Sequence, residues 1–491
     1  MVVAFYILSS LSCLYLLYKD RSHLPGIIIM AALWGAGPGI DGRFLLDEFL
    51  ICLSILFVLL TSWRDFWQRF FRLRTQLTWW DAPLLAFCVY FALQGGRTAL
   101  VMDSPAVLLA GAMNIYVAGI YLVLRMYDVQ AYCAHIFTFN WRGHVRTRSF
   151  ADLIIFAVIL YDAVYIFQGM FAEQVLGVVY TSAPGALGRF ANQGISWSGS
   201  AYAIMPNLIG LYVGAWRFPR HYTQFFILVG LQLLTALTYD SRIALLMFAV
   251  GGAIVLWRLQ LKMFRTGIPI LMITLALCAY VRMASVSVED TIYSTVKSTT
   301  FLVTPTVDEA SHGAGGDYDR YLHFYAGFQA IDDSLPDWAF GHGLMTHRLF
   351  VGPAVLELLR NDPRLSGYED SSTIQHFKNA MDNTIPESEK PVYQRSLLFS
   401  GPRTTTFTAV TIDGGLVGLA LLYASLLSAF LYCTRHVWKL SLHNHRLGAS
   451  VMIFVLLAAW PVVIYLVGST LYWLMLMPAA MAAVLPDETN A

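Results

Sequence analysis

Arg242 is the residue of this sequence whose position most demands a chemical explanation. It ends the segment Tyr239-Asp240-Ser241-Arg242, a connection with almost no length between two strongly apolar runs. A guanidinium at the boundary of an apolar layer is costly unless it pairs with an anion, and its fork of N–H donors matches phosphate oxygens. An ion pair with Asp240, or a side chain that extends toward water, is the structural alternative.

Three more arginines occur where an anion could approach them. Arg189 follows a small-residue loop at 185–188, whose backbone can come close to a phosphate. Arg320 opens a segment with helical patterning, and Arg403 follows Gly401-Pro402 at the end of a long polar interval. With Arg242, these residues are our candidates for binding an anionic substrate group such as a phosphate.

Two histidines are candidates for proton transfer. Spacings of three and four predict an amphipathic helix around 319–331, in which Arg320 and His323 share the face opposite an apolar stripe. His342 lies in the flexible turn Gly341-His342-Gly343, after Pro336 ends that helical pattern. We expect Arg242, Arg320, His323 and His342 to form the catalytic group. For each histidine, a structural role is the alternative.

A metal site is the weaker possibility in this region. Asp317 and Asp319 have the spacing of a carboxylate pair, but no histidine follows at ligand spacing. We therefore expect no metal and no cofactor.

Composition places these residues in a membrane protein. Of the 491 residues, 57% are hydrophobic and 13% are charged, which is too few polar residues for a water-soluble surface. The six cysteines have no short CxxC spacing, so neither a zinc site nor a disulfide framework is expected. The net charge of +1 gives no reason to expect a nucleic-acid partner.

Apolar runs long enough to cross a bilayer predict an all-α polytopic protein with about 13 transmembrane helices, within a range of about 11 to 14. The first run begins at Val2, without a basic start or a small-residue cleavage site, which indicates a retained span rather than a signal peptide. The expected spans are residues 2–18, 24–40, 45–63, 80–94, 107–127, 150–170, 200–216, 224–239, 243–257, 268–283, 406–433, 449–468 and 470–485.

The distribution of basic residues predicts how these spans are oriented. Of the 32 Lys and Arg, 18 fall in short connections on one side, and five fall in short segments on the other: Arg43, Arg97, Arg189, Arg242 and Arg282. Basic residues in short loops stay in the cytoplasm, so the side with 18 is expected to be cytoplasmic and the amino terminus to lie outside.

This orientation divides the chain into three parts. Residues 1–284 carry the first ten spans, residues 285–405 form one large and partly helical periplasmic loop, and residues 406–491 carry the last spans. We expect the loop to fold onto the membrane part.

Several of these features together resemble the family of O-antigen ligases and Wzy-type polysaccharide polymerases. They are the Asp-Ser-Arg segment at 240–242 between two spans, the long outer loop with its arginine helix and Gly-x-Gly turn, and the Gly-Leu-Val-Gly run at 415–418. The resemblance covers about residues 225 to 430. It implies a metal-independent glycosyltransferase of many helices, with Arg242 and Arg320 at the positions of the family's two arginines.

The implied reaction joins undecaprenyl-diphosphate-linked repeat units into an exopolysaccharide or O-antigen on the periplasmic face of the bacterial inner membrane. Arginines would stabilise the charge on the leaving diphosphate. Ligases of the family carry a histidine, usually followed by Asn, just before the glycine-rich span, but this sequence has Thr404-Thr405 there. That difference favours a polymerase over a ligase or a protein O-oligosaccharyltransferase and leaves the general base open.

The expected partners are the lipid-linked glycan donor and acceptor, membrane lipids and a chain-length regulator. A transporter or flippase for lipid-linked glycans is an alternative from another class, although the sequence has no internal repeat of the kind that transporters often show. A structural or signalling membrane protein is the remaining alternative.

Overall fold

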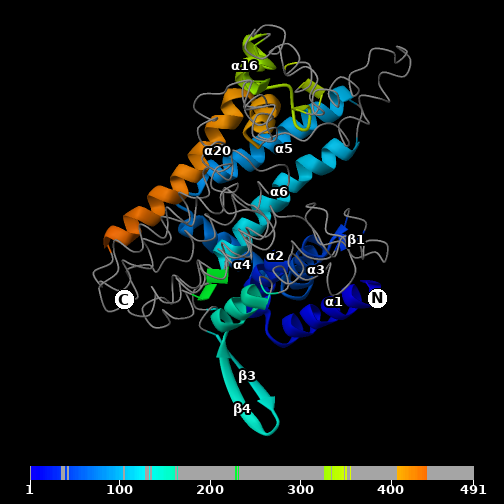
Figure 1. Ribbon diagram of the computed structural model, residues 1–491, viewed down its shortest axis with the longest axis vertical. Coiled ribbons are helices and arrows are strands. Elements are labelled where there is room, and N and C mark those ends of the chain that lie inside the picture. Colours follow the sequence, from blue (N-terminus) through cyan, green and yellow to red (C-terminus); the bar gives the residue numbers. More distant parts are fainter. Residues whose placement is uncertain are drawn as a thin grey trace, which may run out of the picture.

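The structure is a computed structural model of the 491-residue chain. It describes residues 2–34, 39–40, 44–102, 105–127, 132, 135–160, 163, 227–228, 230–231, 326–332, 334–347, 349–350, 354 and 406–439. Within these ranges the protein is mostly helical, as expected, and the helices pack into one body with a small hairpin at one end (Figure 1).

The amino-terminal helices form the first layer. Helix α1 (Val2–Lys19) and helix α2 (Leu24–Trp34) both pack against α3 (Leu46–Thr61). A short 3₁₀ turn, η1 (Arg21–His23), joins the first two helices, and the Asp20 carboxylate caps it by accepting a hydrogen bond from Ser22 N at 2.8 Å. A two-residue ribbon pairs β1 (Gly39–Ile40) with β2 (Phe44–Leu45) before α3.

Helix α4 (Trp63–Gln76) was not expected, because the sequence analysis ended a span at Trp63 and assigned the following arginines to a connection. The chain bends by 107° between α3 and α4. Helix α4 combines basic residues with an aromatic cluster in which Trp67 contacts Trp63, Phe70 and Phe71. A sharply bent amphipathic helix of this composition is typical of a segment that lies along a membrane surface.

Helices α5 (Ala82–Met102) and α6 (Pro105–Met126) form an antiparallel pair at the centre of the described body (Figure 1). Their backbones approach closely where Gly95 faces Gly111, since a Cβ on Gly95 would lie 2.7 Å from the Gly111 Cα. Helix α5 continues about two turns beyond the expected end at residue 94. Arg97, expected in an outer connection, therefore lies within the helix.

A second and longer β hairpin adds strand structure, which was not predicted, to the mostly helical described residues. Strands β3 (Ile136–Trp141) and β4 (His144–Ser149) form an antiparallel hairpin that projects from the helices (Figure 1). Its turn residues Arg142 and Gly143 have φ of 50° and 78°, the backbone conformation of a tight two-residue hairpin turn. At its base, Phe150 N donates to His135 O at 2.9 Å, which ties the hairpin to the helix that follows it at 150–160.

Helix α20 (Thr406–Lys439) is broken at Gly415, where φ is 60° and ψ is −160°. It packs against α5 and against the short helix α16 (Leu335–Phe340), which belongs to the expected outer loop. Segments Ala82–Val101 and Phe407–Ser425 are long and apolar enough to cross a membrane, and the bent pair α3–α4 makes a third candidate. The expected spans between 200 and 283, apart from 227–228 and 230–231, and those after 449 lie outside the described residues.

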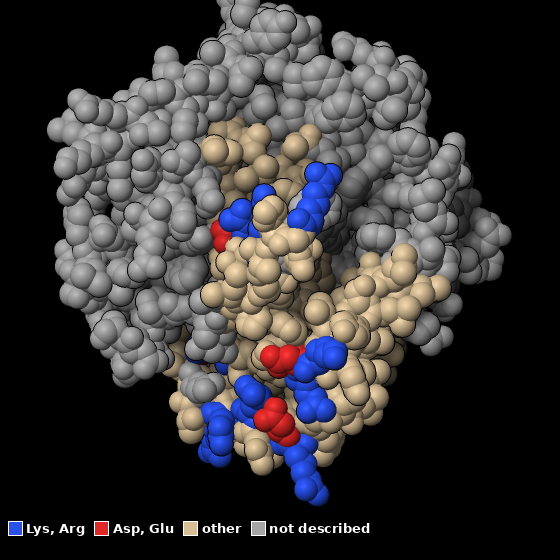
Figure 2. Space-filling model, turned by 90° about the horizontal axis from the view of Figure 1, so that it is seen from below, with Lys and Arg blue, Asp and Glu red and all other residues tan. Residues whose placement is uncertain are grey.

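Basic side chains gather at the end from which the hairpin projects, as the view of that end in Figure 2 shows. Helix α16 lies at the opposite end in Figure 1. Arg142, Arg146 and Arg148 belong to the hairpin at this end. The basic residues that the sequence assigned to one side, and that the structure describes as exposed, are Lys19, Arg21, Arg64, Arg72, Arg74, Arg142, Arg146 and Arg148.

Candidate functional site

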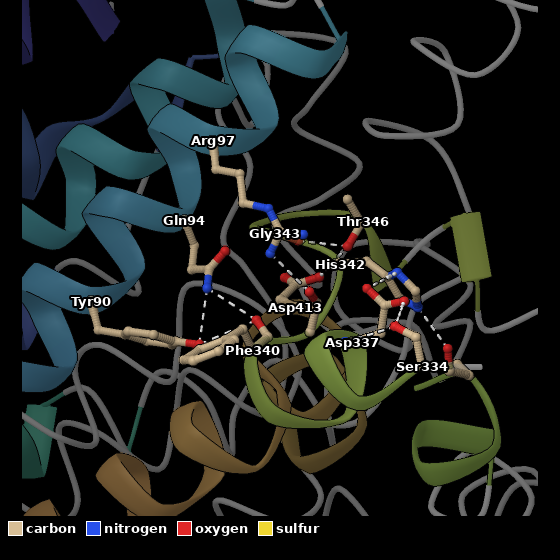
Figure 3. A network of polar contacts seen from close by, with 12 residues as sticks. Tyr90, Gln94, Arg97, Ser334, Asp337, Phe340, His342, Gly343, Thr346 and Asp413 are labelled. Atoms are coloured by element: carbon tan, nitrogen blue, oxygen red, sulfur yellow. Dashed lines mark hydrogen bonds and ion pairs between the residues drawn. The ribbon is translucent and has the colours of Figure 1, made fainter. Parts of the chain in front are cut away.

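Three segments that are far apart in the sequence meet at the end of the molecule that carries α16. They are α5, the segment 341–347, which we call the Gly341 turn, and the broken part of α20 (Figure 3). Polar side chains concentrate at this meeting point between two candidate membrane spans. Burying polar groups between apolar helices costs free energy unless the groups are paired. Their concentration here therefore indicates a candidate functional site.

The residues at the two ends of α16 explain why this helix ends directly before the Gly341 turn. Ser334 caps the helix, since its hydroxyl accepts a hydrogen bond from Asp337 N at 3.2 Å and donates to the Asp337 carboxylate at 2.6 Å. Pro336 lies in the first turn, where its missing N–H costs nothing. The helix ends at Gly341, whose φ of 66° favours glycine.

The Gly341 turn then crosses α20 backbone to backbone. His342 N donates to Ile412 O at 2.8 Å, and Gly343 N donates to Asp413 O at 3.0 Å. Gly415 and Gly341 make this approach possible, because a Cβ on Gly415 would lie 2.6 Å from the Ala339 carbonyl oxygen. Breaks of this kind in membrane helices occur where the freed backbone groups line a polar site within the protein.

Helix α5 contributes three polar side chains from one face, at spacings of four and three residues (Figure 3). Tyr90 donates its hydroxyl hydrogen to Gly414 O at 2.7 Å, and Gln94 Nε2 donates to Phe340 O at 3.0 Å. Arg97 donates to Gly341 O at 3.0 Å. These bonds hold α5, the Gly341 turn and the α20 break together.

Arg97 has unused capacity to bind an anion. Its only recorded hydrogen bond goes to a neutral carbonyl, and it forms no ion pair with any residue that the structure describes. Arg97 is exposed, and its guanidinium carries five N–H donors in a planar fork that fits phosphate or carboxylate oxygens. Arg97 can therefore hold an anionic group near the carboxyl-terminal end of α5.

Asp413 places a carboxylate inside α20 at the centre of the site. The residue is 3% exposed, and its oxygens accept three hydrogen bonds from the Gly341 turn. The donors are Met345 N at 2.8 Å, His347 N at 2.7 Å and His347 Nδ1 at 2.8 Å, while Thr346 Oγ1, which donates to Gly343 O at 2.5 Å, lies 3.3 Å away. Two backbone N–H groups and one imidazole therefore hold the carboxylate in its buried position.

The Asp413 carboxylate also orients the His347 ring. With the carboxylate oxygen as the acceptor, His347 Nδ1 carries the hydrogen of the 2.8 Å bond. The other ring nitrogen, Nε2, then has a lone pair in the neutral imidazole. With 15% of its side chain exposed, His347 is accessible to a small group.

His342, which the sequence predicted as a catalytic candidate, has different surroundings. Its Nε2 lies 2.6 Å from Ala330 O and must donate to it, because a carbonyl oxygen cannot donate. Its Nδ1 lies 3.6 Å from the Asp337 carboxylate, and its ring stacks on Phe350 at 3.9 Å between centroids. These contacts fix the ring between α16 and the segment that follows the turn, which favours the structural alternative.

The remaining predicted site residues, Arg189, Arg242, Arg320, His323 and Arg403, lie outside the described residues, as does the expected convergence of Arg242 with Arg320. The Asp317 and Asp319 pair does so too. Within the described ranges no group of three or more potential metal ligands occurs.

The charged and titratable residues Arg97, Asp413 and His347 of the observed site were not among the predicted site residues, and neither were Tyr90, Gln94 and Thr346. For Arg97 and Asp413, the sequence contains a pattern that could have indicated the site. Arg97 is a basic residue on the side where basic residues are rare, and Asp413 is a carboxylate within an apolar span, which is costly unless it has a function. His347 had no such signal, because only the fold brings it to Asp413, 66 residues away.

A comparison of the chain with family models, curated proteins and solved structures found no match.

Proposed function

We propose that this protein is a membrane glycosyltransferase that polymerises undecaprenyl-diphosphate-linked repeat units on the periplasmic face of a bacterial inner membrane. Donor and acceptor are both lipid-linked glycans. The acceptor hydroxyl attacks the anomeric carbon of the donor, and undecaprenyl diphosphate leaves.

One observation carries the proposal. The Gly341-His342-Gly343 turn and the glycine-rich run at 415–418 are two of the features on which the resemblance to Wzy-type polymerases rests. Gly341 and Gly415 approach backbone to backbone, and the turn donates hydrogen bonds to Ile412 O and Asp413 O just before the run. Sequence features 70 residues apart thus belong to one site. A family pattern that marks a reaction centre is expected to converge in this way.

The charge of the site also suits a diphosphate leaving group. As the glycosidic bond breaks, negative charge grows on the diphosphate oxygens, and arginine donors positioned beforehand lower the barrier. Arg97 supplies such a donor without a carboxylate partner among the described residues. Arg189, Arg242, Arg320 and Arg403 remain proposed contributors from outside the described ranges.

The distribution of basic residues supports the proposed orientation. Exposed arginines lie at the end of the hairpin, while Arg97 and the Gly341 turn lie toward the other end (Figures 1 and 2). If basic connections stay in the cytoplasm, the site faces the periplasm. A lipid-linked glycan that has been moved across the membrane would reach it there.

A transporter of lipid-linked glycans is the second candidate, because broken helices such as α20 are common at transporter substrate sites. A gene deletion separates the two. Loss of a polymerase leaves surface glycan of single repeat length, whereas loss of a transporter leaves lipid-linked repeats on the cytoplasmic face and no surface repeat. Long lipid-linked chains accumulating in the deletion strain would instead indicate a ligase. Surface glycan of normal length would contradict all three.

A further inference from the structure

We infer that His347, positioned by Asp413, is the general base that takes the proton from the attacking sugar hydroxyl. The inference rests on the proposed function and assigns the one role that the sequence left open.

The geometry of the pair supplies what a general base requires. Asp413 Oδ2 lies 2.8 Å from His347 Nδ1, and the carboxylate is held by the backbone N–H groups of Met345 and His347. Both the ring orientation and the tautomer are therefore fixed from the Nδ1 side. A carboxylate in this position stabilises the imidazolium that forms when Nε2 takes a proton.

The other described histidine of the site cannot serve in the same way. His342 uses Nε2 to donate to Ala330 O at 2.6 Å, and its Nδ1 faces Asp337. Taking up a substrate proton there would require the ring to leave its stacking contact with Phe350. Of the two rings, only His347 has no hydrogen bond recorded on its second nitrogen within the described residues.

The base and the cation are held by the same short segment. Arg97 bonds to Gly341 O at the start of the Gly341 turn, and Asp413 bonds to residues 345–347 at its end. The leaving diphosphate needs the cation and the incoming hydroxyl needs the base, so one rigid turn can hold both.

The proposed step balances as follows. The acceptor O–H proton moves to His347 Nε2 while the oxygen forms a bond to the donor's anomeric carbon. The bond between that carbon and the diphosphate oxygen breaks, and its electron pair leaves with undecaprenyl diphosphate. The imidazolium then returns its proton to the diphosphate or to water, which restores the neutral base.

A purely structural role for the pair makes a different prediction. Asp413 would then serve only to cap the N–H groups of residues 345–347, and the imidazole would be one more hydrogen-bond donor. Glutamine at position 347 would replace that donor. A small base added from solution would have no effect on a structural defect.

The experiment uses purified full-length protein and lipid-linked repeat units extracted from a host strain that lacks this gene. We expect His347→Ala and His347→Gln to lower kcat by about 10²- to 10⁴-fold with a much smaller change in KM. Added imidazole should restore turnover to His347→Ala and not to His342→Ala, the matched control in the same turn. Asp413→Asn should lower kcat as well, with Asp413→Glu recovering part of it.

A second measurement does not depend on turnover. Diethyl pyrocarbonate acylates accessible neutral imidazole nitrogens, and mass spectrometry locates the product. We expect His347 to react several-fold faster than His342 in folded wild-type protein. Size-exclusion chromatography and thermal unfolding establish that each variant is folded before it is assayed.

The outcomes separate this inference from the proposed function. Polymer formation by the wild type with undiminished kcat in His347→Gln would overturn the inference and leave the function standing. Failure of imidazole to restore His347→Ala, together with slow acylation of His347, would overturn it too. Absence of polymer from the wild type would remove both the function and the base that it requires.

Discussion

Gly341 and Gly415 meet backbone against backbone, although 73 residues separate them in the chain. A Cβ on Gly341 would lie 2.5 Å from Ile412 O, and one on Gly415 would lie 2.6 Å from Gly341 N. Both residues also have positive φ, 66° and 60°. This contact joins the Gly341 turn to the helix that carries Asp413. The geometry of the site therefore requires glycine, which has no Cβ, at both positions.

Alanine at Gly415 should therefore disrupt the site. Its φ of 60° with ψ of −160° is a conformation that almost only glycine adopts, which by itself costs about 1–3 kcal/mol, and the contact with Ala339 adds to this. We expect a lower midpoint of thermal unfolding. Gly96→Ala is the control, because a Cβ at Gly96 meets nothing within 4 Å. Equal unfolding midpoints for the two variants would contradict the backbone contact.

A buried ion pair near the start of α5 should contribute more to the stability of the folded protein than an exposed ion pair does. The Asp81 carboxylate lies 3.3 Å from Arg125 Nε and accepts a hydrogen bond from Tyr121, and its side chain is 6% exposed. Removing one partner from a buried pair typically costs about 3–5 kcal/mol. We expect Asp81→Asn to lower the unfolding midpoint strongly.

The matched control is Asp65→Asn, which breaks the exposed pair with Arg69 on α4. Exposed helix pairs at this spacing contribute only about 0.3–0.5 kcal/mol. Similar losses of stability in the two variants would show that Asp81 and Arg125 do not form the buried pair described here.

The pH dependence of stability should report on His23. Burial lowers the pKa of this histidine below its usual value of 6.5, while Asp20 opposes the shift and His135 adds to it. Since the folded pKa lies below the unfolded one, the unfolded state binds more protons, and stability must fall as the pH drops below about 6.5.

We expect the unfolding midpoint to decrease between neutral and mildly acidic pH in the wild type and to decrease less in His23→Gln. The hydrogen bond between His23 Nδ1 and the Tyr132 hydroxyl, 2.7 Å, is lost or rearranged in this variant, so the comparison concerns the slope with pH and not the absolute midpoint. A steeper slope in His23→Gln would contradict the burial of a neutral ring.

The orientation of the two ends can be tested with single cysteines in a variant whose native cysteines are replaced. Val145 on the hairpin is 67% exposed and Trp338 on α16 is 45% exposed, so cysteines at these positions should accept a membrane-impermeant maleimide. We expect Trp338→Cys to be labelled in intact spheroplasts and Val145→Cys only after lysis. The reverse pattern would place the site on the cytoplasmic face.

Sequence patterns predicted the long apolar helices well, because a helix such as α6 differs from the expected span 107–127 by only one or two residues at each end. They predicted α5 poorly. The expected span ended at residue 94, where the apolar run stops, but Gly95 packs against Gly111 within the helix pair, and this tertiary contact overrides the weak helix propensity of glycine.

Neither the hairpin nor the centre of the site was predicted from sequence patterns, and the reasons differ. Arg142 in the hairpin turn and Arg146 and Arg148 in β4 were interpreted only as basic charge, so neither the alternation of the strands nor the Arg142-Gly143 turn entered the prediction. Asp413 and His347 form a pair only because the break at Gly415 lets the Gly341 turn cross α20. No local spacing encodes a contact of that kind.

The most direct test of the proposed function measures polymer formation by purified protein from lipid-linked repeat units extracted from a host strain that lacks this gene. The wild type should convert single repeats into a ladder of longer glycans and release undecaprenyl diphosphate. Arg97→Gln should lower the rate by about 10²- to 10³-fold, as expected for a donor to the leaving group, whereas Arg74→Gln on the exposed surface of α4 should leave it unchanged. A wild-type protein that forms no ladder, or equal rates in the two variants, would contradict the account.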